Sequence, residues 1–227
     1  QKELYHAHAQ RLALMLQNQT EEEFADSRFQ VLSELTRLRQ LCCDPALVYE
    51  NYEGGSAKLD LCIELIQSAV ESGHKILLFS QFTSMIEILT ARLQEESISY
   101  FVLQGSTKKE QRAQMVEQFN RDDTSVFCIS LKAGGTGLNL TGADIVIHYD
   151  PWWNVAVENQ ATDRAHRIGQ KNVVTVYKLI AKGTIEEKII KLQQMKKELA
   201  EEILSGDEIK TASFQREELL ELLEERF

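Results

Sequence analysis

Residues 75–89 read KILLFSQFTSMIEIL and join two kinds of pattern. The stretch 75–80 is a short continuous apolar run, which is typical of a strand covered on both faces of a sheet. From Thr83 to about Glu95 the apolar residues recur at the spacing of a helix. We therefore expect a buried strand that leads directly into a helix.

The same alternation continues on both sides of this stretch. We expect further strands at 99–103, 125–130, 144–149 and 173–180, and further helices at 56–72, 107–120 and 154–166. Thr107 and Glu110 have the spacing of a capping box, and so do Thr184 and Glu187 at the start of a long helix. Strands that alternate with helices of this length predict an α/β fold, namely a parallel β-sheet with helices on both faces.

Both ends of the chain have helical patterns. Apolar residues recur at helical spacing through residues 1–41, with a break expected near Asn18, Gln19 and Thr20. Downstream we expect one helix at 184–204 and a last, acidic helix at 215–226. We therefore divide the chain into an N-terminal helical segment at 1–55, an α/β lobe at 56–182 and C-terminal helices at 183–227.

The net charge is −10, and residues 201–227 carry −6 of it. An acidic chain argues against broad nucleic-acid binding, so DNA contact would need a local basic or amide-rich site. The acidic C-terminal helix either docks on a protein partner or forms a solvated tail.

The composition is that of a globular protein, with 43% hydrophobic and 26% charged residues. No run of 18 apolar residues occurs, so we expect no membrane span and no membrane partner. The four cysteines lack C-x-x-C spacing and have no histidine at zinc-ligand distance in sequence. We therefore expect buried thiols in a reducing compartment, and no metal site.

Ligands of parallel sheets bind at the carboxyl ends of the strands, and three sets of residues there are candidates. The stretch 130–139, SLKAGGTGLN, has glycine amides that suit a phosphate, although a tight strand-to-helix turn would explain the glycines too. Small polar residues that suit phosphates, or equally helix caps, end other strands: Ser80, Gln81, Gly105, Ser106 and Thr107.

The third set of candidates follows the expected strand at 144–149. Placed on a helix, Gln160, Arg164 and Arg167 are spaced i, i+4, i+7 and would form one stripe. Paired guanidinium groups suit phosphate oxygens, and a solvated basic face is the alternative. Two roles are open for the adjacent Trp152 and Trp153. They could stack on a base, or one of them fills a core pocket while the other is partly exposed.

Together these strings resemble the second RecA-like lobe of a Swi/Snf-type, superfamily 2 DNA translocase. The resemblance is carried by KILLFSQFTSMIEIL (75–89), QRAQMVEQFN (111–120), SLKAGGTGLNLTGADIVIHYDPWWN (130–154) and QATDRAHRIGQ (160–170). Upstream, LTRLRQLCCDPALV (35–48) resembles the helical segment that leads into this lobe. Downstream, residues 176–204 resemble the brace helix between the two lobes.

The resemblance implies a RecA-like fold and a role for each candidate residue. Two lobes of such a motor clamp ATP and move along double-stranded DNA, shifting bound proteins. Arg164 and Arg167 match arginine-finger positions of the catalytic site. Positions that match the ATP site are Gly135, Gly137, Leu138 and Gln160. Positions that match contacts to the DNA backbone are Ser80, Gln81, Gly105, Ser106, Ser130 and Lys132.

The resemblance also implies what other parts of the motor supply. A Walker A loop and an acidic Mg²⁺ cluster belong to the first lobe, and neither string occurs in this chain. ATP and Mg²⁺ would therefore be bound mainly by the missing first lobe, and this chain alone would not hydrolyse ATP. The Pro-Trp-Trp string at 151–153 resembles bacterial members, so we expect a cytoplasmic, nucleoid-associated protein rather than a nuclear one.

Two other functions stay open. A non-catalytic protein-interaction module with a RecA-like fold would keep the shape of a motor without its chemistry. A dinucleotide-binding or glycosyl-type enzyme is disfavoured, because Leu140 stands where the dinucleotide fingerprint needs its third glycine.

Overall fold

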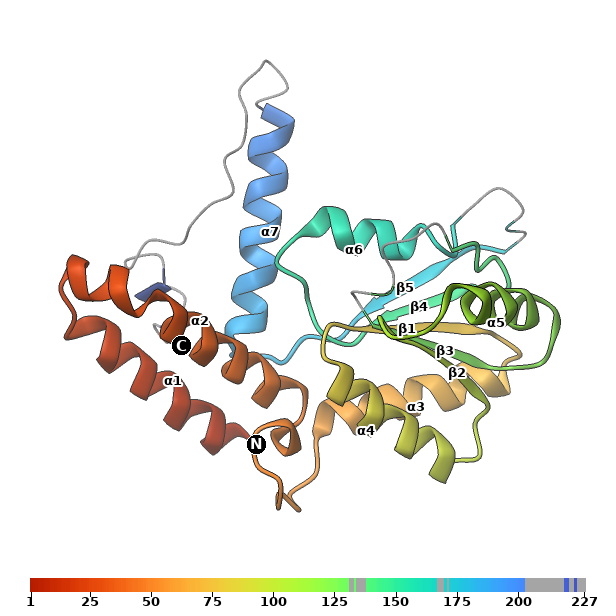
Figure 1. Ribbon diagram of the computed structural model, residues 1–227, viewed down its shortest axis with the longest axis horizontal. Helices are drawn as coiled ribbons and strands as arrows, with labels where there is room; N and C mark the ends of the chain where they lie inside the picture. Colours follow the sequence, from red (N-terminus) through yellow and green to blue (C-terminus); the bar gives the residue numbers. More distant parts are fainter. Residues whose placement is uncertain are drawn as a thin grey trace. The chain divides into compact units, whose positions relative to one another are not determined.

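The computed structural model of the chain describes residues 1–130, 133, 138–166, 170, 172–202, 219, 220 and 223 (Figure 1). The chain forms two compact units. One, which we call the helical unit, comprises residues 1–55 and 181–227, and the other, the sheet unit, comprises residues 56–180. The helices described in these residues include none that is both long and apolar enough to cross a membrane.

The sheet unit contains five parallel strands. They are β1 (Ile76–Ser80), β2 (Tyr100–Leu103), β3 (Val126–Ser130), β4 (Ile145–His148) and β5 (Thr175–Lys178). Their order across the sheet is β2-β3-β1-β4-β5, and every neighbouring pair is parallel. The parallel sheet expected from the alternating pattern is therefore confirmed.

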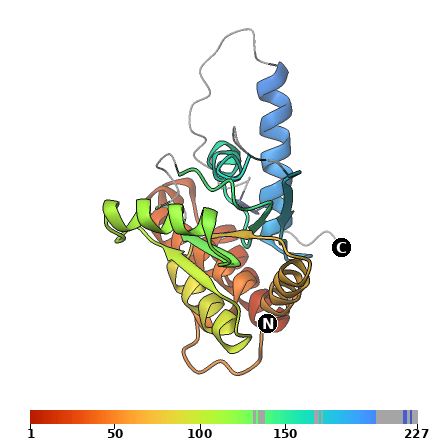
Figure 2. The same cartoon turned by 90° about the vertical axis from the view of Figure 1, so that its right-hand side faces the viewer.

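Helices cover both faces of this sheet. They are α3 (Ala57–Glu71), α4 (Thr83–Glu95), α5 (Lys109–Arg121) and α6 (Val155–Thr162). Figures 1 and 2 show α3 and α4 on one face, and α5 and α6 on the other. Short crossovers between parallel strands place the helices in this way.

One hydrophobic cluster of the sheet unit lies between the strands and helices α5 and α6. Leu77 and Phe79 of β1 pack there with Phe119 of α5 and Phe127 of β3, all fully buried. The rings of Phe119 and Phe127 meet edge to face, with centroids 5.2 Å apart. Each such side chain contributes roughly 1.5–3 kcal/mol by its burial.

The expected capping box at Thr107 is wrong. Helix α5 begins at Lys109, and its N-cap residue Lys108 makes no side-chain cap bond. The Thr107 hydroxyl instead accepts a hydrogen bond from the Gln104 amide at 3.1 Å. Thr107 therefore stabilises the turn that precedes α5 and does not cap the helix.

The helical unit contains α1 (Lys2–Gln17), α2 (Glu21–Cys43), the short 3-10 helix η1 (Pro45–Leu47) and α7 (Ile185–Glu202). The break between α1 and α2 lies at the expected residues, and Thr20 and Glu23 form a capping box there that the sequence analysis missed. The Ile185 amide donates to the Tyr5 hydroxyl at 2.7 Å, which joins the start of α7 to α1. The side chains of residues 196–202 and most residues of the acidic helix expected at 215–226 lie outside the described part.

Candidate nucleotide and nucleic-acid interface

The carboxyl edge of the sheet gathers most of the described candidate residues. Ser80 and Ser130 end the adjacent strands β1 and β3 and are partners in the strand register. Gly105 and Ser106 follow β2, on the other side of β3. The predicted DNA-backbone residues that the structure describes thus come from three neighbouring strand ends.

Asp150 organises the end of β1 from the end of β4. Its carboxylate is fully buried and accepts a hydrogen bond from the Ser80 hydroxyl at 2.6 Å. The backbone amide of Gln81 and its side-chain amide also donate to Asp150. Hydrogen bonds to an ionised group are the stronger kind, so Asp150 holds the turn after β1 in one position. Asp150 was not predicted as a site residue, although its place two residues after the end of β4 was a signal.

Burial separates the predicted DNA contacts into two groups. The hydroxyl groups of Ser80 and Ser130 are buried, with exposed fractions of 0% and 1%. The Ser130 hydroxyl has no hydrogen-bond partner among the described residues. Gln81 is half-buried, whereas Gly105 and Ser106 are exposed. In this structure, Gly105 and Ser106 are therefore open to solvent, whereas Ser80 and Ser130 are not. Lys132 lies outside the described residues.

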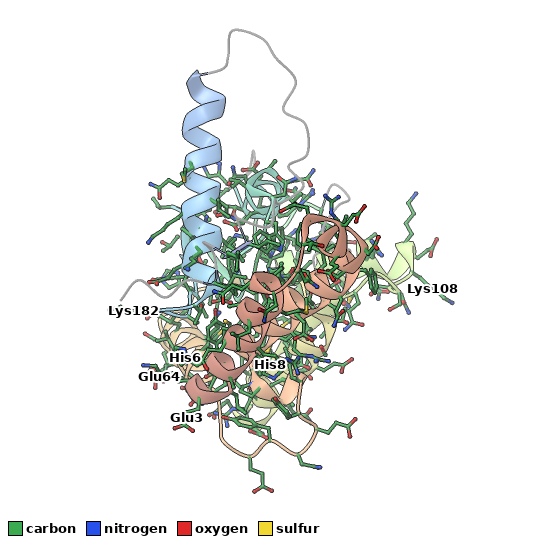
Figure 3. The ribbon with its side chains drawn as sticks, turned by 90° about the vertical axis from the view of Figure 1, so that its left-hand side faces the viewer. Glu3, His6, His8, Glu64, Lys108 and Lys182 are labelled. Carbon is green, nitrogen blue, oxygen red and sulfur yellow. The ribbon has the colours of Figure 1, made fainter. Side chains whose placement is uncertain are left out.

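The turn 104–107 is held from within by Arg112 of α5. The Thr107 amide donates to the Gln104 carbonyl at 3.0 Å, which closes the turn. The Arg112 guanidinium donates to the Thr107 carbonyl at 2.8 Å and to the Gly105 carbonyl at 3.0 Å. The turn therefore presents Gly105 and Ser106 to solvent in a fixed shape, beside the outward-pointing Lys108 (Figure 3).

The expected stripe of Gln160, Arg164 and Arg167 on one helix face is wrong. Helix α6 ends at Thr162, and the Arg164 amide donates to the Ala161 carbonyl at 3.1 Å in a tighter turn. Gln160 is exposed on α6, whereas the Arg164 side chain is only 2% exposed. Arg167 lies outside the described residues.

Contacts across the fold explain why α6 ends early. The Thr162 hydroxyl lies 3.0 Å from Nε2 of His148 at the end of β4. The carbonyl of Arg164 accepts a hydrogen bond from the Leu140 amide at 3.0 Å. These contacts fix the chain beyond Thr162 against the segment that follows the glycine-rich stretch. Local helical periodicity did not contain this information.

Of the other predicted ATP residues, Gly135 and Gly137 lie outside the described residues. Leu138 is 9% exposed and belongs to the core of the sheet unit. Its side chain is therefore part of the packing, and only its backbone would be available to a nucleotide.

A buried polar cluster beside this edge was also missed. Glu158 of α6 is 1% exposed and forms an ion pair with Lys178 of β5. His148 lies near both, and burial lowers the pKa of its imidazole to about 4. Such a low pKa keeps His148 neutral at neutral pH.

The predicted buried thiols can be checked at all four cysteines, which lie in the described part of the chain. All four cysteines are buried and none forms a disulfide, and burial raises the pKa of the Cys128 thiol to about 12. In the described ranges, no group of three His, Cys, Asp or Glu side chains is placed to hold a metal ion.

Comparisons with known proteins connect this edge to a family. Residues 57–169 match the model of the helicase conserved C-terminal domain. An uncharacterized ATP-dependent helicase of Mycoplasma pneumoniae is 45% identical over 202 residues, which cover 87% of this chain and 19% of that protein. The human chromatin-remodeling ATPase INO80 is 44% identical over 169 residues, which cover 74% of this chain and 11% of that protein.

Two solved structures from Sulfolobus solfataricus are also similar. The SWI2/SNF2 ATPase C-terminal domain has a TM-score of 0.72 and 32% identity, covering 91% of this chain and 85% of that chain. The SWI2/SNF2 ATPase core in complex with double-stranded DNA has a TM-score of 0.74 and 35% identity, covering 89% of this chain and 42% of that chain.

The sheet and its matched family model define the C-terminal domain of a superfamily 2 helicase, with the expected RecA-like fold. The chain belongs to the Swi/Snf family of these ATPases and corresponds to the second RecA-like lobe. It spans about a fifth of the length of the Mycoplasma and Bacillus subtilis relatives that it matches.

Proposed function

We propose that this chain is the second lobe of an ATP-dependent motor that moves on double-stranded DNA and remodels protein–DNA complexes. The observation that carries the proposal is the likeness over 89% of the chain to an archaeal ATPase core solved with double-stranded DNA. The relatives named as ATP-dependent helicases and remodelling ATPases support the same activity for the full-length protein.

The DNA contacts in this proposal are made to the backbone. Gly105, Ser106 and Gln81 offer amide and hydroxyl groups to phosphate oxygens, and Lys132 adds a positive charge. Ser80 acts from beneath, because its buried hydroxyl group donates to Asp150 and supports the turn after β1. Ser130 is buried as well, and its hydroxyl has no partner among the described residues. Backbone contacts carry little sequence information, so binding would weaken with salt and vary little with base sequence.

ATP is the substrate, and this lobe contributes positive charge to it. Arg167 is proposed as the arginine finger that stabilises charge on the γ-phosphate during transfer. Arg164 was predicted for the same role, but its side chain is 2% exposed and would have to rearrange before it met a phosphate. Arg167 therefore carries the catalytic proposal, with Gly135, Gly137, Leu138 and Gln160 at the edge of the nucleotide site.

Mg²⁺ is assigned to the first lobe. The described part of the chain offers no group of carboxylates that fits the ion. We therefore place no Mg²⁺ ligand among these residues, and no step of the reaction here depends on one.

The experiment measures ATP hydrolysis by the full-length protein with and without duplex DNA. Arg167→Ala should lower the DNA-stimulated rate of ATP hydrolysis at least about a hundredfold, as loss of other arginine fingers does. Arg121→Ala is the matched control, because this arginine is 77% exposed and, among the described residues, its ion pair is with Glu117 on its own helix. A rate that responds neither to DNA nor to Arg167→Ala would contradict the proposal and favour a non-catalytic module.

A further inference from the structure

One side chain holds both ends of the loop that follows the glycine-rich stretch. The Asn120 side-chain amide donates to the Asn139 carbonyl at 2.8 Å. Its oxygen accepts a hydrogen bond from the Gly142 amide at 2.8 Å. Asn120 is the penultimate residue of α5, so this joint fixes the end of that helix to residues 139–142.

The joint leaves no room for a side chain at Gly142. A Cβ atom there would lie 3.0 Å from the Asn120 Cα and 3.3 Å from the Phe119 carbonyl oxygen. Both neighbours are backbone atoms, which cannot move aside as a flexible side chain would. Glycine is therefore required for close approach between the loop and α5.

The same helix grips the exposed turn at its other end. Arg112, in the first turn of α5, donates to the carbonyl groups of Gln104, Gly105 and Thr107. Arg112 and Asn120 are eight residues apart, which is about 12 Å along a helix. Within the described residues, no hydrogen bond of Asn120 reaches the turn 104–107.

The carboxyl end of α5 is also fixed to the sheet. Lys75, next to β1, donates to the Asp122 carbonyl at 2.7 Å and to the Phe119 carbonyl. Its ammonium group lies 4.3 Å from the centre of the Phe119 ring. The helix is thus held at both ends by several polar contacts.

We propose that α5 is a strut that couples the turn 104–107 to the loop 139–142, with Arg112 and Asn120 as its positioning residues. This inference rests on the proposed function, in which the turn contacts DNA and the loop leaves the nucleotide site. A short helix is stiff, so a shift of the turn on DNA displaces the loop as well. Coupling of this kind is demonstrated when a change at the loop 139–142 has a measurable effect at the turn 104–107.

The test changes Asn120 and observes the distant turn. In the full-length protein, Asn120→Ala should speed hydrogen exchange of the Gln104 and Thr107 amides, which close the turn. The DNA concentration for half-maximal stimulation of ATP hydrolysis should rise roughly threefold or more, as loss of the two hydrogen bonds of Asn120 would cause. Arg121→Ala, at the next position of the helix, should change neither quantity.

Further variants separate the strut from simpler explanations. Asn120→Asp keeps the acceptor for Gly142 but loses the donor to Asn139, so it should give a weaker form of the same effect in a well-folded protein. Arg112→Lys keeps the charge but not the planar fork, and it should also speed exchange in the turn. If Arg112→Lys behaves as wild type, charge alone matters and the strut is overturned.

The strut and the proposed function fail in different ways. Unchanged exchange at Gln104 and Thr107 in Asn120→Ala overturns the strut, even if DNA stimulates hydrolysis normally. A wild-type protein that DNA does not stimulate overturns the proposed function, and the exchange comparison then decides the strut alone.

Discussion

Acidification should destabilise the sheet unit through His148. The imidazole is 1% exposed and stacks on Phe79, with ring centroids 5.5 Å apart. Its Nε2 lies 3.0 Å from the Thr162 hydroxyl, which itself donates to the Glu158 carbonyl. Nε2 therefore carries the proton, and Nδ1 is left buried without a partner among the described residues. A second proton on Nδ1 would have no acceptor, and burial accordingly lowers the pKa to about 4.

The sign and size of the effect follow from the two pKa values. In the unfolded chain the pKa of His148 returns to the ordinary value of 6.5, so below this pH the unfolded state binds the proton first. The free energy of unfolding therefore falls as the pH drops from 6.5 towards 4. At 1.36 kcal/mol per pKa unit, the full loss is about 3 kcal/mol, of which about 2 kcal/mol is reached at pH 5.

The assay is urea denaturation at pH 7.5 and pH 5.0. Trp152 and Trp153 are the two tryptophans of the chain and both lie in the sheet unit, so fluorescence of the chain reports that unit. His148→Phe keeps a ring against Phe79 and removes the titrating group. The wild type should lose about 2 kcal/mol more than His148→Phe between the two pH values. Equal losses in both proteins would refute the assignment of a buried, neutral His148.

Three other predictions concern catalysis and stability. The 227-residue chain by itself should show no ATP hydrolysis above a buffer blank, because it lacks a Walker A loop; a steady rate that Arg167→Ala abolishes would contradict this. Asp150→Asn should lower the free energy of unfolding by about 2–4 kcal/mol, because charge-assisted bonds to Ser80 and Gln81 are lost, and an unchanged denaturation midpoint would argue against the clamp. Thr20→Ala should cost about 1 kcal/mol by removing a capping box, measured by thermal unfolding, and a cost near zero would mean that the cap is dispensable.

The order of elements could be predicted because each strand has a strong local signal. Stretches such as 76–79 and 126–129 are apolar throughout, and the structure buries all five residues of β1 and of β3. The edge strand β5 is shorter than the expected 173–180, and all of its side chains are exposed. Its length is set by pairing with the four residues of β4, which a local pattern does not contain.

The errors in the candidate site have a common physical cause. Thr107 has the sequence spacing of a helix cap, but its hydroxyl accepts a hydrogen bond from the Gln104 amide instead. The arginine stripe assumed that α6 continues, whereas contacts of Thr162 and Arg164 with distant segments end the helix. In both cases a specific tertiary partner outweighs a weak local preference.

The residues that were missed are those defined by distant partners. Asp150 and Ser80 are 70 positions apart in sequence, and Asn120 and Gly142 are 22 apart. No local spacing pairs such residues. Their chemistry could be suspected from their places at strand and helix ends, but the pairing itself required the fold.

The central claim is that the full-length protein moves along double-stranded DNA, and triplex displacement tests it most directly. A third strand bound to duplex DNA is released when a motor travels through it, without separation of the duplex itself. Release of the third strand should require ATP, fail with Arg167→Ala and persist with Arg121→Ala. ATP hydrolysis without any release of the third strand would contradict the account, because the protein would then consume ATP without moving on DNA.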